Sequence, residues 1–382
     1  MRLACHESLR HNRGMSETAE ESLKNSSSLR RGWTTGTCAT AAARAAYEGL
    51  VTGRTPPAVT IRLPGGQLPS FAINEGKIAH HGASASVVKD AGDDPDVTHG
   101  ALVRAHLSLG ATNTGIIFRA GAGVGTVTRP GLPLPVGEPA INPGPRRMMV
   151  ANLLDTADQF DGPRDIVVTI EIPNGEALAR KTMNGRLGIE GGLSILGTTG
   201  VVVPFSCAAW VHAIHSGIDV AVAMGLSHIG AATGSTSEEI LRTHYRLPEV
   251  ALIDMGDFAG AVFKYLRHKP LSRLTLVGGV GKFAKLAQGA LDLHSGRSQL
   301  DFLHLSQRAK VLGISASGEA AIARSRSAAE AMTHADAEGI PLASAIAAAA
   351  RETAATVLMR ADIDIAVVVV DRAGYILGKV ES

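Results

Sequence analysis

The second half of the chain alternates short apolar runs with helical patterns, and this alternation constrains the fold more than any other feature. Each run passes through a loop of glycine, hydroxyl or acidic residues into a helical pattern, in the segments LSILGTTG, LSHIGAATGSTS, VALIDMG and LTLVGGVGK. An alanine-rich helical tail over residues 299–359 precedes one or two closing strands. Strands that alternate with helices predict a doubly wound α/β domain with a mostly parallel sheet, which we place over residues 191–382.

Residues 29–190 show a mixed pattern instead. A helix of small residues is expected over residues 37–50, followed by a hairpin that turns at Gly65 and Gly66. A later strand, DIVVTIEIP, precedes a short helical pattern. Between them, residues 115–149 contain too much glycine and proline for regular structure. We predict an α+β domain with long loops, which in a compact domain are usually functional.

Composition narrows the classes of function. The chain has 382 residues, of which 45% are hydrophobic and 19% charged, enough for two domains with substantial cores. A net charge of +2 and 4% aromatic residues argue against a nucleic-acid partner. We expect a cytoplasmic protein with no membrane partner, because no apolar run reaches membrane-spanning length and no signal-peptide pattern is present. Residues 1–28 are polar and are expected to be disordered, and translation begins at either Met1 or Met15.

Four loops of the second half follow predicted strands. Ligands of open α/β sheets bind beyond the carboxyl ends of the strands, where glycine lets the backbone approach a nucleoside. Small residues at such turns also serve packing alone, but four loops together favour a nucleotide-like ligand. The candidate contacts are Gly197, Thr198, Thr199, Gly200, Thr233, Gly234, Ser235, Asp254, Gly278, Gly279 and Gly281.

The loop GGVGK is not a phosphate-binding P-loop, because Phe283 stands where that motif has serine or threonine. The residues from Gly279 to Ala284 do fit the G-x-G-x-x-A turn of dinucleotide-binding folds. The second strand with an acidic end that this motif requires does not follow at the expected distance. A nucleotide-dependent oxidoreductase is therefore kept as an alternative only.

The stretch RRGWTTGTCATAAARAA places a turn of threonine and glycine before a helix. The unpaired N–H groups and the positive dipole end of a helix start suit an anionic ligand. An ordinary helix cap at Thr34, Thr35 or Thr37 explains the same residues. The turn therefore predicts either an anion-binding helix start or a plain cap.

The loop KDAGDDPD gathers four aspartates, Asp90, Asp93, Asp94 and Asp96. Crowded carboxylates raise one another's pKa, which can make one of them a usable proton acceptor. A solvated turn, or an Asp96 cap on a helix beginning near Val97, explains them equally well. The spacing does not fit an EF-hand calcium loop.

Arginines lie on several loops of the first half. Arginine binds carboxylates and phosphates through a planar fork of donors, so Arg129, Arg146 and Arg147 together suit a polyanionic small molecule. A surface salt bridge explains any single one of them. We expect no metal site, because the three cysteines are scattered and no nearby carboxylate or cysteine joins His212 and His215.

Six segments occur in the order found in one known family: LRRGWTTGTCATAAARAA, VVKDAGDDPDVTHGA, GVGTVTRPGLPLPVGEPAINPGPRRM, RLGIEGGLSILGTTGVVVPFS, DMGDFAGAVFKYLRHKP and LTLVGGVGKFAKLAQGALDLHS. Across residues 29–295 the chain thereby resembles the cobalt-precorrin-5B C(1)-methyltransferases of anaerobic cobalamin biosynthesis. The resemblance implies methyl transfer from S-adenosylmethionine to carbon 1 of a corrinoid, giving cobalt-precorrin-6A. It also implies a first domain similar to ribosomal S5 domain 2-like folds and a layered α/β second domain.

With this resemblance, we expect the donor in the loops of the second domain and the corrinoid between the domains, facing the loops of the first. The corrinoid carries many carboxylates, which arginine loops suit. Asp90 or Asp94 is predicted to take up the ring proton, and the predicted substrate contacts are Arg31, Thr35, Gly36, Thr37, Arg129, Arg146 and Arg147. A non-catalytic corrinoid carrier is the second alternative. The sequence leaves the oligomeric state open, a homo-oligomer included.

Overall fold

The computed structural model describes residues 29–381, which form a mixed α/β structure divided into two compact units. Of the described residues, the first unit contains 29–128 together with Pro133–Ser206, and the second contains Arg129–Leu132 and 207–381. The disorder expected for residues 1–28 lies outside the described residues. Sequence reasoning assigned residues 191–206 to the second domain. They join the first unit because β13 (Val201–Val202) pairs with β1 (Gly32–Trp33), a contact between distant segments.

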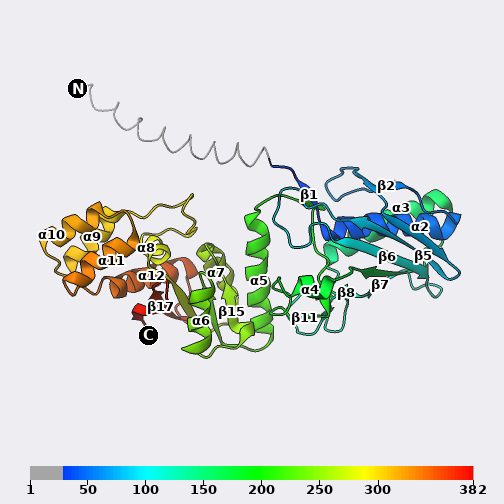
Figure 1. The fold of residues 1–382 in the computed structure, drawn as a ribbon. Helices are drawn as coiled ribbons and strands as arrows, with labels where there is room; N and C mark the ends of the chain where they lie inside the picture. Colours follow the sequence, from blue (N-terminus) through cyan, green and yellow to red (C-terminus); the bar gives the residue numbers. More distant parts are fainter. Residues whose placement is uncertain (1–28, 382) are drawn as a thin grey trace, which may run out of the picture. The chain divides into compact units, whose positions relative to one another are not determined.

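The first unit is built on a five-stranded sheet with the order β4-β5-β6-β10-β7. Strands β7 and β10 are parallel, and the other neighbours are antiparallel. Alternate residues of β5, β6 and β10 are buried, and they form one core with two long helices (Figure 1). The bounds are β4 (Glu75–Ala79), β5 (Gly82–Val88), β6 (Leu102–Leu109), β7 (Ile116–Ala120), β10 (Ile166–Glu171), α2 (Thr35–Thr52) and α3 (Pro143–Phe160).

Helix α2 packs closely because small residues form most of its surface. Its fully buried alanines are Ala39, Ala41, Ala42, Ala43, Ala45 and Ala46. Thr34 caps the helix, since its Oγ accepts a hydrogen bond from the Thr37 N–H at 3.2 Å. The helix ends before Gly53, whose φ of 73° favours glycine.

Short elements complete the first unit. The expected hairpin is confirmed, because β2 pairs antiparallel with β3. The prediction that residues 115–149 lack regular structure is wrong, because they hold β7, β8, β9 and the start of α3. Pro143 fits there because the first helical position needs no N–H donor. The short elements are β2 (Ala58–Thr60), β3 (Ser70–Ala72), β8 (Gly123–Val124), β9 (Thr126–Val127), α4 (Gly175–Ala179), β11 (Ile189–Glu190) and β12 (Gly192–Leu193).

The second unit contains a mostly parallel sheet with the order β15-β14-β16-β17-β18. The first four strands are mutually parallel, and β18 is antiparallel to β17. The strands are β14 (His228–Ala232), β15 (Leu252–Asp254), β16 (Arg273–Gly279), β17 (Asp364–Val370) and β18 (Ile376–Val380). The connecting elements are α5 (Cys207–Ala223), α6 (Ser235–Thr243), η1 (Glu249–Ala251), α7 (Ala259–Leu266), α8 (Val280–Ala287), α9 (Phe302–Val311), α10 (Ala316–Arg324), α11 (Ala328–Ala337) and α12 (Leu342–Leu358).

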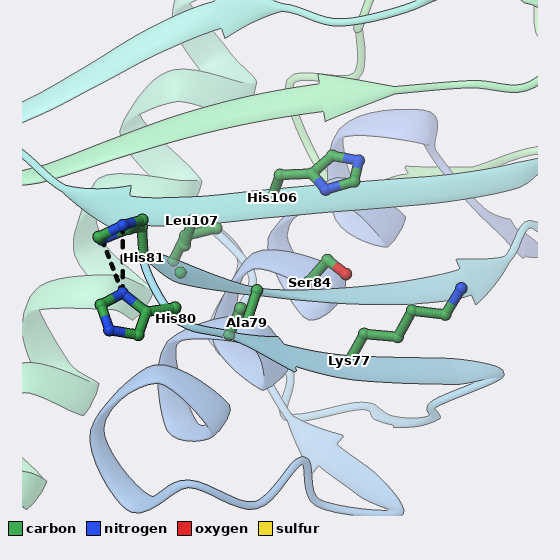
Figure 2. A pocket seen from close by; sticks show the side chains of 9 residues that line it. Lys77, Ala79, His80, His81, Ser84, His106 and Leu107 are labelled. Carbon is green, nitrogen blue, oxygen red and sulfur yellow. Dashed lines mark hydrogen bonds between the residues drawn. The ribbon is translucent and has the colours of Figure 1, made fainter.

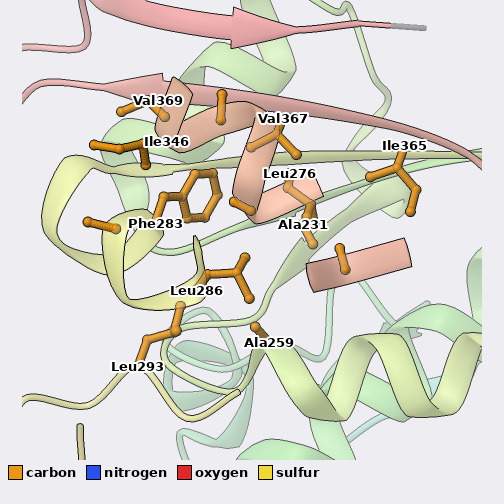
Figure 3. Close-up of a cluster of buried hydrophobic side chains, with 14 of the residues drawn as sticks. Ala231, Ala259, Leu276, Phe283, Leu286, Leu293, Ile346, Ile365, Val367 and Val369 are labelled. Carbon is orange, nitrogen blue, oxygen red and sulfur yellow. The ribbon is translucent and has the colours of Figure 1, made fainter. Parts of the chain in front are cut away.

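Both faces of this sheet are covered by helices, as its continuous apolar strands require. On one face, Leu276 and Val367 pack with Phe283 of α8 and Ile346 of α12 (Figure 3). On the other, the neighbouring Val277 packs with side chains of the α6 region. None of the helices in the described part of the chain is long and apolar enough to cross a membrane.

Candidate functional site

The sheet of the second unit has a point where its connections diverge. From β14 the chain passes through α6 to β15 on one side, and then through α7 to β16 on the other side of β14. Ligands of such folds usually bind in a crevice at the carboxyl edge of the sheet, between the two strands where the connections diverge, here β14 and β16. We refer to this expected ligand position as the crevice. Five predicted donor contacts lie at the ends of these two strands: Thr233 and Gly234 follow β14, Ser235 begins α6, and Gly278 and Gly279 end β16.

The backbone is open at two of the predicted glycines. A Cβ added at Gly234 would meet no atom within 4 Å, and one at Gly279 would meet only the Val370 carbonyl oxygen at 4.0 Å. A Cβ at Gly278 would lie 2.5 Å from the Phe283 ring, so this glycine serves packing. Gly234 and Gly279 are thus the positions where a ligand can approach the main chain closely.

Lys282 connects the loops around the crevice. Its Nζ donates to the Thr233 carbonyl oxygen at 2.9 Å and lies 3.1 Å from Asp257 Oδ1. The Asp257 carbonyl in turn accepts from the Leu293 N–H at 2.8 Å. In the sequence, Lys282 was considered only as part of the failed P-loop match. Its partners Thr233 and Asp257 are 49 and 25 residues away and give no local signal.

Aromatic side chains lie beside the loop that follows β15. The half-exposed Trp210 donates from its indole Nε1 to the Asp254 carbonyl oxygen at 3.1 Å, and its ring lies against Gly256. The ring of Phe258 lies 6.4 Å from the Trp210 ring, between centroids. Trp210 was missed in the sequence. It is one of only two tryptophans in the chain, and its place in the first turn of a helix was a usable signal.

The loop Gly197–Gly200 lies elsewhere, so the prediction that four loops share one sheet edge is wrong. The Gly200 carbonyl oxygen accepts from the Thr37 Oγ at 2.6 Å and from the Thr34 N–H at 3.1 Å, both in the first unit. Thr198 lies against Gly144 of α3. The loop precedes β13, which pairs with β1, and this pairing holds it at the start of α2.

Four segments meet at this place in the first unit. The Gly36 N–H donates to the Leu196 carbonyl at 3.1 Å, and a Cβ on Gly36 would lie 2.7 Å from Pro145 of α3. The fourth segment is the aspartate loop, because Arg31 and Gly92 form an antiparallel bridge. The starts of α2 and α3 are thereby joined to the aspartate loop and to the loop Gly197–Gly200, which are more than 100 residues apart in the sequence.

The predicted pocket residues of this helix start are enclosed by protein. Thr35 is 5% exposed and Thr37 is 0% exposed. Gly36 is also buried, and its N–H is bonded within the protein. The plain-cap interpretation therefore describes this turn, and Gly36 and Thr37 bond to the segment at residues 196–200. Arg31, in contrast, is exposed.

Asp90 is bound by Arg30. The guanidinium Nη2 lies 2.9 Å from Asp90 Oδ1, and a second nitrogen pairs with Oδ2. This hydrogen bonding lowers the pKa of Asp90 to about 2. A carboxylate with so low a pKa is a weak proton acceptor, which argues against Asp90 as the base. Sequence reasoning missed Arg30, which lies 60 residues away.

Asp96 stabilises a buried cation. Lys89 is 1% exposed, and its Nζ pairs with Asp96 and donates to the Thr98 Oγ at 2.7 Å. Burial raises the pKa of Asp96, but the Lys89 charge and the bonds from Lys89 and Thr98 outweigh it and lower that pKa. The expected helix near Val97 is wrong: Asp96 accepts from the Thr98 N–H at 2.7 Å within a turn.

The predicted arginines have different environments. Arg146 is used internally: its Nε donates to the Ile141 carbonyl at 2.7 Å, and its Nη2 lies 2.9 Å from Glu138. Arg147, the next residue of α3, is exposed. Arg129 belongs to the short segment Arg129–Leu132 of the second unit. Of these three arginines, Arg147 is thus the exposed one of the first unit, whereas Arg146 is bound within the protein.

An open pocket lies on the first sheet, away from every predicted site residue (Figure 2). It has a volume of about 560 Å³, and the His80 and His81 rings meet at its edge with centroids 4.3 Å apart. His106 is engaged by Glu171 at 2.7 Å. Among residues 29–381, no group of three or more histidine, cysteine or acidic side chains is arranged to hold a metal. The pocket is lined by Lys77, Ala79, His80, His81, Gly82, Ala83, Ser84, His106 and Leu107.

Comparison with known proteins gives the family. Residues 22–204 match the CbiD family and residues 292–381 match the CbiD C-terminal domain. The cobalt-precorrin-5B C(1)-methyltransferase of a Bradyrhizobium species is 53% identical over 365 residues, which cover 96% of each chain. The chain belongs to the CbiD family.

Further members of the CbiD family agree over similar lengths. The enzyme of the same name from Methylorubrum extorquens is 54% identical, with 91% of this chain and 97% of that one covered. A crystal structure of the cobalamin biosynthesis protein CbiD from Archaeoglobus fulgidus is 30% identical, covering 66% of this chain and 78% of that chain, with a TM-score of 0.38. The crevice loops at residues 233–282 lie between the two matched family regions.

Proposed function

We propose that this chain methylates carbon 1 of cobalt-precorrin-5B to give cobalt-precorrin-6A. The observation that carries the proposal is the 53% identity to an enzyme of that name over 96% of both chains. The reaction breaks the methyl–sulfur bond of a sulfonium donor and leaves that electron pair on sulfur. An electron pair of ring carbon 1 forms the new carbon–carbon bond, and one proton is released from the ring. Correct alignment of donor and acceptor supplies much of the acceleration, on the order of 7–11 kcal/mol in well-oriented systems.

We assign the donor, S-adenosylmethionine, to the crevice between the loops after β14 and β16. Gly234 and Gly279 leave room for a nucleoside against the backbone, and Thr233 and Ser235 supply hydroxyl groups. The Asp254 loop lies next to them, because β15 and β14 are neighbours. Lys282 has the role of fixing the crevice, since it joins the Thr233 and Asp257 loops.

The corrinoid acceptor is assigned to the place in the first unit where the starts of α2 and α3 meet the aspartate loop. The exposed Arg31 and Arg147 are suited to carboxylates at the rim of the ring. Thr35, Gly36 and Thr37 are buried at the start of α2 and support this surface from inside the protein. Asp94 remains in the site, but its hydrogen bond to Phe205 gives it a different role, argued in the next subsection.

The same proposal covers the finer features of the fold and setting. The first unit is a ribosomal S5 domain 2-like domain, and the second is a doubly wound donor-binding domain. The enzyme works in the cytoplasm, and a homo-oligomer is compatible with this assignment. The strand order of the second sheet, whose connections diverge between β14 and β16, supports a doubly wound second unit.

Two measurements test the proposal. Purified protein is incubated with methyl-labelled S-adenosylmethionine and cobalt-precorrin-5B, and label is followed into the corrinoid. Calorimetric titration with S-adenosylhomocysteine and, separately, NAD distinguishes the oxidoreductase alternative. Binding of NAD alone would refute the methyltransferase assignment, and corrinoid binding without label transfer would establish a carrier.

A further inference from the structure

Phe205 combines two features that are each unfavourable for a phenylalanine. Its φ of 55° is in the left-handed region, where a bulky residue is a rare outlier. Its side chain is 68% exposed, although burial of an aromatic ring normally stabilises a fold. A residue kept in a strained conformation with its ring in solvent is a feature typical of functional sites.

Asp94 holds Phe205 in this conformation. Its Oδ1 accepts from the Phe205 backbone N–H at 2.8 Å, a bond across 111 residues of sequence. Both residues belong to the first unit, where β13 pairs with β1 and Arg31 bridges to Gly92. The aspartate loop and the segment that carries Phe205 therefore contact each other directly through Asp94, and each of them also pairs with residues 31–33.

The surface around Phe205 carries both apolar and cationic groups. On the same segment, Leu196 is 50% exposed and Val203 is 46% exposed. The β1–β13 register, continued by one pair, places Arg31 opposite Val203. A flat ring with carboxylates at its rim matches such a surface, since its face contacts apolar side chains and its rim meets the guanidinium.

We propose that the Phe205 ring supports the flat face of the corrinoid acceptor, and that Asp94 is a positioning residue that keeps Phe205 in place. This rests on the acceptor assignment made above. This role replaces the prediction of Asp94 as a base. The Asp94 carboxylate accepts the Phe205 N–H and acts by fixing the position of that residue. Phe205 is then a residue that binds substrate.

Four variants of the full chain test this, with kcat and KM measured for cobalt-precorrin-5B and labelled donor. Phe205→Ala should raise the acceptor KM roughly tenfold or more, as expected when an aromatic stacking contact is lost. Phe205→Gly should show the same KM effect with a raised melting temperature relative to Phe205→Ala, because glycine adopts a positive φ without strain. The affinity for S-adenosylhomocysteine should be unchanged in both.

Asp94→Asn and Asp94→Ala separate positioning from proton transfer. The asparagine oxygen can still accept the Phe205 N–H, so Asp94→Asn should retain near-normal kcat, whereas Asp94→Ala should raise the acceptor KM severalfold. If Asp94→Asn lowered kcat, or raised the acceptor KM as much as Asp94→Ala, Asp94 would be acting through its charge and the inference would fail. An unchanged KM in Phe205→Ala would also overturn it. Wild-type protein that transfers no methyl group would instead refute the proposed function itself.

Discussion

The two units differ in how their glycine-rich loops are used. In the first unit, the turn at Thr35, Gly36 and Thr37 and the loop at Gly200 are buried against one another. In the second, Gly234 and Gly279 leave their backbone open beside a crevice. Similar strings of glycine and threonine thus serve packing in one unit and leave the backbone open in the other. The difference depends on what lies within 4 Å of each glycine, which sequence composition does not contain.

Gly200→Val should produce the largest effect on stability. Gly200 has a φ of 86°, and an added Cβ would lie 2.9 Å from both Leu63 and Thr37. Backbone strain and overpacking together predict a loss of about 3 kcal/mol in the free energy of unfolding. Chemical denaturation of the full chain measures it, with donor affinity of the folded fraction unchanged. A stable variant with weak donor binding would reverse the comparison between the units.

Gly279→Val should instead weaken donor binding and leave the stability of the fold unchanged. The side chain would occupy the space where the donor is assigned, so affinity for S-adenosylhomocysteine should fall roughly tenfold or more, which corresponds to at least about 1.4 kcal/mol. The control is Gly185→Val in an exposed turn of the first unit, where an added Cβ also meets nothing within 4 Å. Calorimetry with equal affinity in wild type and Gly279→Val would remove this loop from the donor site.

Adjacent arginines of α3 offer a smaller contrast. Arg147→Gln should raise the acceptor KM about threefold to tenfold with kcat unchanged, because it removes a ground-state contact. Arg146→Gln should instead cost about 1–2 kcal/mol of stability, since Arg146 bonds to the Ile141 and Pro139 carbonyls. Steady-state kinetics and thermal melting distinguish the two. Identical behaviour of the pair would contradict the assigned difference.

The smallest expected effect concerns Arg30 and Asp90. The folded-state pKa of Asp90 is lowered from 3.8 to about 2, so its stabilising contribution is complete above pH 3.8 and is lost as the pH falls towards 2. The pair is half exposed and solvent screens it, so its contribution should be small. Arg30→Met should flatten the acid limb of a stability–pH curve in this window. An unchanged limb would show that the pair contributes nothing.

The sequence predicted the parallel sheet because continuous apolar runs such as that in β17 have few alternative structures. It failed where a few residues pair over long distances. The pairing of β1 with β13, which joins Gly32 to Val202, places the loop Gly197–Gly200 in the first unit. A strand of two residues is too short to show a periodic pattern in the sequence. The partners of the aspartate loop, Arg30 and Phe205, were missed for the same reason, since side-chain contacts across 60 and 111 residues leave no local signal.

The ladder between β1 and β13 also affects how the protein is made. Gly32 and Val202 are 202 − 32 = 170 residues apart, so the first unit cannot close until synthesis has passed its end. At about 5–20 residues per second, this delay is on the order of 10–30 seconds. During that time the edge of β1 that pairs with β13 is unpaired, and an unpaired edge can pair with other chains. Completion of the first unit is therefore the step of biosynthesis at which this chain most needs protection from aggregation.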